Sequence, residues 1–204
     1  LYSSAASDVY KRQLYRLDMQ TLQAELLIDK DGFISGARFS PDGTQVLVSG
    51  SPESLGGIGK NVKEGQTPSM TDGQLYLLNI ADKRVTPLTK DFNPSVQRAV
   101  WNKADGQIYF TAENRDCYSL YRMNPADGKI QQLEVSEDLV NSFSLAQNAP
   151  VMAYYGQSAS NSDRLYTMNT KKMKSSLLED LSKDILKDVE PVSYTHLRAH
   201  ETEA

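Results

Sequence analysis

The chain has 204 residues, of which 39% are hydrophobic and 24% charged, and its formal net charge is −4. A mildly acidic chain lacks the basic face that nucleic-acid binding requires, so we expect no nucleic-acid partner. No apolar run is long enough to predict a transmembrane helix, and the single cysteine, Cys117, cannot form a disulfide within the chain.

Both ends of the chain are interpreted as translated sequencing adaptors. Residues 1–13 contain SSAASDVYKRQ, which reads as a transposon-type adaptor codon by codon. The reverse complement of the codons for DVYKRQ encodes VSYTH in another frame, and VSYTH stands at 192–196. One DNA element in two orientations explains both tails, whereas two ordinary disordered tails would leave this relation a coincidence. We therefore exclude residues 1–13 and 191–204 from fold reasoning.

This exclusion bears on catalysis. His196 and His200 are the only histidines and lie in the excluded tail, so residues 14–190 contain no imidazole. A Ser-His-Asp triad needs an imidazole base, and histidine zinc sites need its nitrogen. The nearest match to the Gly-x-Ser-x-Gly elbow, GQSAS at 156–160, lacks its last glycine. We expect no catalytic residue, no metal site and no cofactor in this chain.

A five-residue motif, leucine and tyrosine followed by two residues and Asp or Asn, occurs four times. The copies are LYRLD at 14–18, LYLLN at 75–79, LYRMN at 120–124 and LYTMN at 165–169, with tyrosines 61, 45 and 45 residues apart. A period near 45 is typical of a four-stranded propeller blade. The wider first interval contains the segment 51–73, rich in Gly, Ser and Pro, which we interpret as an inserted loop.

A strand, a tight turn and a second strand precede each complete copy of the motif. The turns FSPDG at 39–43 and NKADG at 102–106 combine Asp, which caps a turn, with Gly, which accepts positive φ. The flanking residues are aromatic or β-branched, as strands favour. The third strand-turn-strand segment, at 143–155, matches this pattern only poorly. Each unit is thus predicted to contain four strands.

The repeats predict an all-β fold, namely a partial β-propeller of TolB/WD-like repeats with about three four-stranded blades and a partial one. A β-sandwich does not predict four copies of one motif in phase. Because a closed propeller needs at least four blades, we expect an open arc. The expected segments are the blades 14–30 (partial), 33–90, 95–135 and 139–180, and a linker at 181–190.

Several stretches resemble known propeller families. The FSPDG turn resembles the repeat of TolB-like propellers and of the propellers in prolyl oligopeptidase family serine peptidases. GIGKNVKEG at 57–65 followed by DGQLY at 72–76, and YFTAENR at 109–115, resemble the dipeptidyl-peptidase and acylaminoacyl-peptidase branch. Residues 181–190 resemble the passage toward an α/β-hydrolase domain. The resemblance covers residues 14–190.

The resemblance implies a function for a parent enzyme. In that family an N-terminal propeller lies over a C-terminal α/β-hydrolase and restricts access to its active site. This chain would be a non-catalytic propeller fragment of a serine exo- or oligopeptidase, gating or contacting peptide substrate for a hydrolase domain in cis that the sequence lacks. By itself it would be inactive. The compartment stays open, and a periplasmic or secreted parent is compatible with the resemblance.

The alternative is a TolB-like propeller that acts as a protein-binding module. The two hypotheses differ in whether the gene continues into a hydrolase.

The expected substrate contacts are Glu113, Asn114 and Arg115, which follow a predicted inner strand. A carboxylate at this position is suited to pair with the free amine of a peptide. Because inserted loops concentrate function, the segment 51–73 is expected to border the substrate entrance. The competing interpretation is that these side chains only form a solvated turn.

Overall fold

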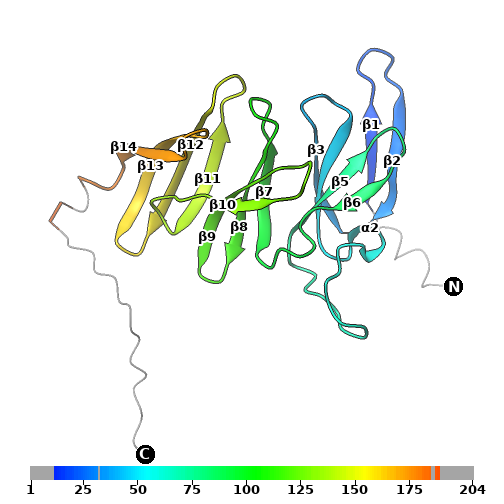
Figure 1. The fold of residues 1–204 in the computed structure, drawn as a ribbon, viewed down its shortest axis with the longest axis horizontal. Coiled ribbons are helices and arrows are strands. Elements are labelled where there is room, and N and C mark those ends of the chain that lie inside the picture. The colour runs from blue at the N-terminus through cyan, green and yellow to red at the C-terminus, as the bar shows by residue number, and fades with distance from the viewer. Residues whose placement is uncertain (1–11, 32, 185–186, 189–204) are drawn as a thin grey trace, which may run out of the picture. The chain divides into compact units, whose positions relative to one another are not determined.

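The computed structural model describes residues 12–31, 33–184 and 187–188 (Figure 1). The chain divides into two compact units, residues 1–133 and residues 134–204. The two histidines and nearly all of the tails interpreted as adaptors lie outside the described residues. Arg12 and Gln13, which we assigned to the first tail, begin strand β1.

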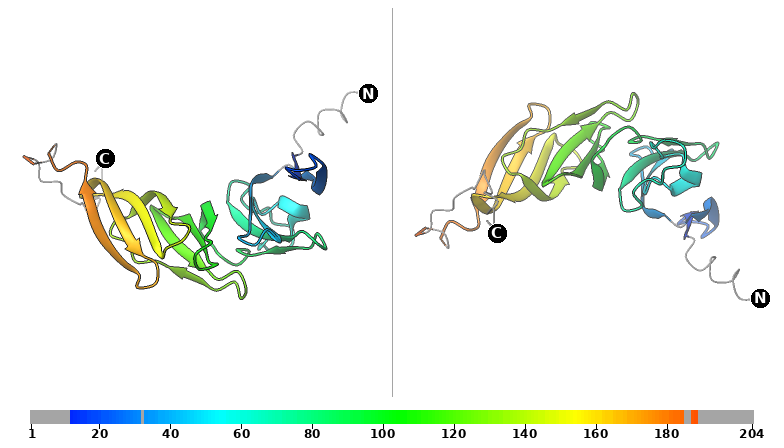
Figure 2. Two further views of the ribbon diagram at one scale, coloured as in Figure 1. Left: turned by 90° about the horizontal axis from the view of Figure 1, so that it is seen from above. Right: turned by 90° about the horizontal axis from the view of Figure 1, so that it is seen from below.

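The first unit contains a hairpin, a separate four-stranded antiparallel sheet, and four further strands that pair antiparallel in chain order and are called the second sheet (Figures 1 and 2). The hairpin consists of β1 (Arg12–Leu17) and β2 (Ala24–Asp31). The first sheet consists of β3 (Ile34–Phe39), β4 (Gln45–Gly50), β5 (Gln74–Asn79) and β6 (Val85–Pro87), with a short helical turn, α2 (Ser54–Gly57), between β4 and β5. The second sheet consists of β7 (Ser95–Trp101), β8 (Ile108–Asn114), β9 (Cys117–Met123) and β10 (Ile130–Gln132).

The second unit repeats the same arrangement once. Its strands pair antiparallel in chain order, and they are β11 (Leu139–Leu145), β12 (Val151–Ser158), β13 (Asn161–Asn169) and β14 (Lys174–Asp180). The first strand of each of the three sheets carries a register shift at the same point, so that Ser35, Gln97 and Asn141 are left out of the pairing. Because a β-bulge adds one residue to one strand, its recurrence shows that one structural unit is repeated. The predicted all-β repeat is confirmed.

The last residue of the LY motif is Asp or Asn in every copy because its side chain caps the turn that follows. Asp18, Asn79, Asn124 and Asn169 each accept a side-chain hydrogen bond from the backbone N–H two residues later, at 2.8, 2.9, 3.0 and 3.1 Å. Short carboxylate and amide side chains form such Asx turns readily. The motif therefore ends its strand and starts the turn to the next one.

The tyrosine of the motif anchors the interior of each complete sheet. Tyr76, Tyr121 and Tyr166 are buried, whereas 51% of Tyr15 is exposed, since β1 pairs only with β2 among the strands of the described residues. The Tyr166 hydroxyl donates a hydrogen bond to Glu137 at 2.5 Å. Burial, with this hydrogen bond as a second cause, raises the pKa of Tyr166 to about 12.

The inner strands β4 and β5 bury side chains on both faces of their sheet, because side chains alternate along a strand. Val46 and Val48 of β4 pack with residues of the β1–β2 hairpin, and Leu47 between them packs with β7–β9. The same alternation in β5 sends Tyr76 to the first cluster and Leu75 to the second. The second cluster holds the sheet β3–β6 against the strands β7–β9. This packing sets the positions of the loops at the ends of both.

The turn between β3 and β4 is stabilised around Asp42. Its carboxylate accepts hydrogen bonds from the Ser40 hydroxyl at 2.6 Å, the Thr44 hydroxyl at 2.9 Å and the Thr44 backbone N–H at 3.1 Å. The Ser40 hydrogen bond, followed by those of Thr44, lowers the pKa of Asp42 below its usual value of 3.8. Gly43 follows at φ 73°. The Asp-Gly turn predicted from the sequence thus forms as a hydrogen-bonded unit.

We expect Asp42→Asn to lower the melting temperature at pH 7 by an amount that shrinks as the pH falls. A carboxyl whose pKa is depressed by folding stabilises the fold above its unfolded pKa, about 3.9, and this contribution is lost as the pH falls through the folded pKa. Thermal unfolding of both proteins between pH 7 and pH 3 measures the difference. A difference independent of pH would contradict this role of the carboxylate.

Two equivalent turns provide a second test of the repeat. Gly128 and Met173 occupy the same turn position after Asn124 and Asn169, and both have positive φ, 69° and 52°. Methionine in this conformation is strained, since its Cβ approaches the neighbouring carbonyl. Met173→Gly should therefore raise the free energy of unfolding by about 0.5–1 kcal/mol, and Gly128→Met should lower it by about 1 kcal/mol. Urea unfolding measures both, and a shift of the same sign in the two variants would refute the equivalence.

Candidate functional site

A polar cleft of about 720 Å³ opens in the first unit beside the turn between β8 and β9. We call it the hairpin cleft. Its lining comes from the inserted loop 51–73, the connection from β6 to β7, β7 itself, and the β8–β9 hairpin with its neighbour β10. The lining residues are Thr71, Asp72, Asn93, Pro94, Ser95, Gln97, Glu113, Asn114, Arg115, Asp116, Cys117, Ser119 and Gln132.

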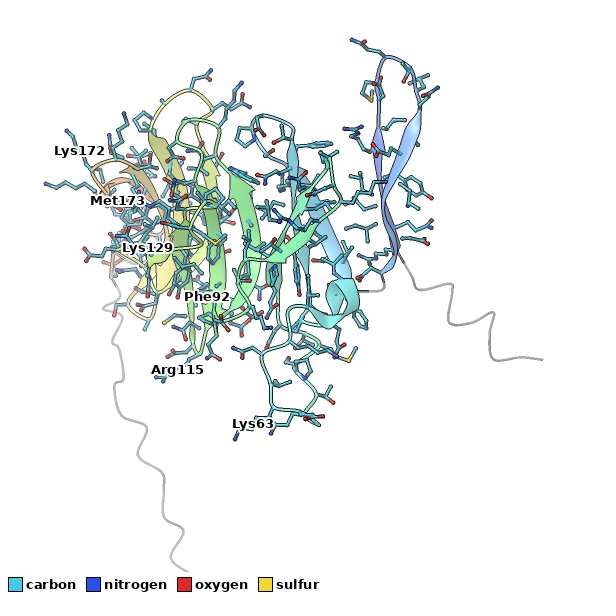
Figure 3. The ribbon with its side chains drawn as sticks, turned by 45° about the vertical axis from the view of Figure 1, so that its right-hand side comes forward. Lys63, Phe92, Arg115, Lys129, Lys172 and Met173 are labelled. Atoms are coloured by element: carbon cyan, nitrogen blue, oxygen red, sulfur yellow. The ribbon has the colours of Figure 1, made fainter. Side chains whose placement is uncertain are left out.

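The three predicted contact residues lie together on this lining. Glu113 and Asn114 end β8, and Arg115 is the first residue of the two-residue turn to β9. Arg115 has φ 60°, a conformation that costs energy for any residue with a Cβ. Figure 3 shows Arg115 and Lys63, near the tip of the inserted loop, at the same end of the first unit. Whether these residues contact substrate stays a prediction.

The hairpin cleft carries an excess of negative charge. Asp72, Glu113 and Asp116 contribute carboxylates, and Arg115 is the one cation in the lining. Glu113 is exposed and accepts a hydrogen bond from the Gln97 side chain at 3.4 Å. In the described part of the chain, Arg115 forms no ion pair with any of these acids. The acids are therefore available to a cationic ligand.

The inserted loop reaches the cleft because its end is fixed to β7. The Gly73 N–H donates to the Ser95 hydroxyl at 2.9 Å, and the Val96 N–H donates to the Gly73 carbonyl at 2.9 Å. A Cβ on Gly73 would lie 1.8 Å from the Val96 carbonyl oxygen, so only glycine permits this approach. The junction helps to hold Asp72, the residue before Gly73, in the lining of the cleft.

The sequence predicted the hairpin residues and the loop 51–73, but it did not single out Asp72 within that loop and it missed Asn93 and Gln97. Glu113 and Gln97 meet because β7 and β8 pair with Ser95 opposite Glu113 and with a bulge at Gln97. No spacing in the sequence predicts that bulge. Asp72 reaches the lining of the cleft only because the neighbouring Gly73 is hydrogen-bonded to β7.

The lining of the cleft presents charged and hydrogen-bonding side chains. Within residues 12–31, 33–184 and 187–188, no three His, Cys, Asp or Glu side chains are grouped to hold a metal. Among the same residues, no helix has the length and apolar character needed to cross a membrane. Carboxylates on an open polar surface bind ammonium and guanidinium groups.

Comparison with known proteins identifies the architecture. No protein-family model and no curated protein sequence matches the chain. Among solved structures, acylaminoacyl peptidase of Pyrococcus horikoshii aligns over 89% of this chain and 25% of its own, with 20% identity and a TM-score of 0.63. TolB from Acinetobacter baumannii aligns over 83% and 38%, with 17% identity and a TM-score of 0.60. The β-propeller domain of the Trilobed protease from Pyrococcus furiosus aligns over 83% and 44%, with 19% identity and a TM-score of 0.59.

These similarities show the fold. The predicted partial β-propeller is confirmed, since propeller proteins of two kinds, TolB and peptidases, share the arrangement of strands. The chain spans between a quarter and somewhat less than half of the length of these three proteins.

The Gly73 junction yields a test with a matched control. Gly73→Ala should lower the free energy of unfolding by about 1–3 kcal/mol, because the new Cβ forces the loop away from Val96. Gly36→Ala should change it by less than about 0.5 kcal/mol, since a Cβ there meets Ser49 at an ordinary 3.9 Å. Urea unfolding compares the two variants. Equal effects would mean that the close approach at Gly73 does not constrain the loop.

Proposed function

We propose that this chain is a non-catalytic propeller module of a serine peptidase and that its hairpin cleft contacts the peptide substrate. Two kinds of observation support the proposal. The fold is similar to that of a peptidase and of a protease propeller domain. The motifs at 57–65, 72–76 and 109–115 resemble the peptidase branch.

The observation that carries the proposal is the acidic character of the hairpin cleft. Glu113 directly follows five buried residues of β8, so the core holds its backbone in place. Asp72 approaches from the inserted loop. A peptide with a free amino terminus offers an ammonium group that forms charge-assisted hydrogen bonds with such carboxylates. The cleft is thus suited to hold the amine of a substrate.

In this proposal the propeller also gates a C-terminal α/β-hydrolase domain, to which residues 181–190 would lead. Sequencing the source gene beyond the codon for Glu190 tests this part. A following domain with a Gly-x-Ser-x-Gly elbow, an acid and a histidine is the expected result. A reading frame that instead adds propeller repeats and stops would overturn it.

A second candidate function is that of a TolB-like propeller which binds protein partners. The similarity to TolB, with 83% of this chain aligned at a TM-score of 0.60, favours it. In this case the gene would lack the hydrolase, and the hairpin cleft would show no preference for a free amine.

The amine contact is tested with Glu113→Gln. This change keeps the size of the side chain and removes its charge, so we expect binding of a short peptide with a free amine to weaken roughly twofold to fivefold, the range of an exposed ion pair. Titration calorimetry with the free peptide and its N-acetylated form measures the effect.

Glu64→Gln is the matched control, because Glu64 is an exposed acid of the inserted loop outside the lining of the cleft. It should leave binding unchanged, and the acetylated peptide should bind all three proteins weakly. Equal binding of the free and acetylated peptides to the unmodified chain would refute amine recognition.

A further inference from the structure

A groove of about 280 Å³ is lined by residues of β3, β4 and β7 in the first unit, and we call it the strand groove. It exists because two small residues face each other in the first sheet. Gly36 of β3 pairs with Ser49 of β4, and a Cβ on Gly36 would meet the Ser49 side chain at 3.9 Å. The pairs at the same place in the other two sheets, directly after the bulge, are Arg98–Thr111 and Ser142–Tyr155. The first sheet therefore has the smallest pair at this place, which leaves room for the groove.

The apolar part of the lining belongs to the core. Leu47 of β4 is 1% exposed and Ala99 of β7 is 7% exposed, and both are members of the buried cluster between the two sheets. Because this cluster holds the sheets together, the strands that line the groove are fixed before any ligand arrives.

Arg38 supplies the charge of the strand groove. It pairs with Leu47, and residues that are directly opposite in a sheet share a face, so Arg38 lies on the face that packs toward β7–β9. Arg98 also lines the groove, but it lies on the other face of its sheet, since its neighbour Ala99 pairs with Phe110 of the buried cluster. The side chain of Arg38 is exposed, and within the described part of the chain no carboxylate forms an ion pair with it.

The repeated unit does not require a charge at this position. The residues at the place of Arg38 in the other two sheets are Val100 and Ser144, since they pair with Tyr109 and Ala153 as Arg38 pairs with Leu47. A guanidinium here is therefore a feature of the first sheet and not of the blade.

The groups in the lining suit a carboxylate. A guanidinium holds a carboxylate by two parallel charge-assisted hydrogen bonds, and a serine hydroxyl donates one more. Ser35 and Ser49 line the groove together with Arg38. The charge is opposite to that of the hairpin cleft, where Asp72, Glu113 and Asp116 are carboxylates.

The two sites lie along the same strand. Ser95, opposite Glu113, begins β7, and Ala99 lies four residues further along it, a distance of about 13 Å at roughly 3.3 Å per residue. An extended peptide of about four residues has this length. A short peptide therefore matches the two sites in both charge and span, with its amine at one and its carboxylate at the other.

We propose that the strand groove binds the C-terminal carboxylate of a short peptide whose amine lies in the hairpin cleft. This inference rests on the proposed function, since it places the amine of the same peptide. The substrate class is then peptides of about four residues with both termini free.

NMR titration of the full chain with tetraglycine and its C-terminal amide tests the groove. Tetraglycine should bind roughly twofold to fivefold more tightly than the amide, the range of an exposed ion pair. Arg38→Gln should reduce the binding of tetraglycine to that of the amide and leave the amide unchanged. Arg84→Gln is the matched control, because Arg84 is an exposed arginine outside both linings, and it should retain the preference for the free acid.

The peptide Gly-Gly-Asp-Gly-amide distinguishes the source of the carboxylate, since its only carboxylate is on a side chain. It should bind no more tightly than tetraglycine amide. If it binds as tightly as tetraglycine and loses this gain in Arg38→Gln, the groove takes an acidic side chain and the proposal of a C-terminal site is overturned.

The remaining outcomes separate this inference from the proposed function. Equal binding of tetraglycine and its amide would overturn the carboxylate site and leave amine recognition standing, as would a preference for the free acid that survives in Arg38→Gln. If N-acetyl-tetraglycine binds as tightly as tetraglycine, amine recognition falls while an Arg38-dependent preference for the free acid still supports the carboxylate site. If none of these peptides binds, both proposals fall.

Discussion

The packing of one four-stranded sheet on the next is the constraint on which the rest of the first unit depends. Leu47 and Leu75 from the first sheet meet Val96, Ala99 and Phe110 from the second in one buried cluster. Strand alternation makes this possible, because it gives each inner strand an apolar residue toward each neighbour. With the two sheets fixed, the ends of β4 and β5 and the end of β8 are fixed as well.

The candidate site follows from this arrangement. The inserted loop leaves β4 and returns to β5, and Gly73 ties its end to the backbone of Val96, a member of the same cluster. The hairpin of β8 and β9 supplies further lining residues of the cleft. Phe92 lies between core and surface, since its ring packs on Phe110 and the residue also lines a second, smaller cleft. The site is thus an exposed polar surface on a rigid support, the arrangement that binding loops generally have.

The lining of the hairpin cleft is rich in charged and hydrogen-bonding groups. Residues 14–190 contain no histidine, and the cleft offers carboxylates, amides and one guanidinium. Exposed ion pairs contribute little free energy each, so binding at a surface of this kind needs several contacts together. Arg115 is held in a strained turn at the edge of this surface. Strained backbone conformations at non-glycine residues are often found at binding sites.

The sequence by itself determined the repeat: the four LY motifs, their spacing and their Asp-Gly and Asn turns predicted four-stranded units, because these signals act between residues a few positions apart. It also pointed to Glu113, Asn114 and Arg115, because the end of a strand before a tight turn can be read locally. Only the tertiary structure decided that Asp72, Asn93 and Gln97 join them and that Phe92 and Val62 share a second cleft. Those contacts depend on a bulge in β7 and on the close approach of the Gly73 backbone to Val96. Strand register and distances between segments are determined by the packing of whole sheets, and local sequence preferences do not determine them.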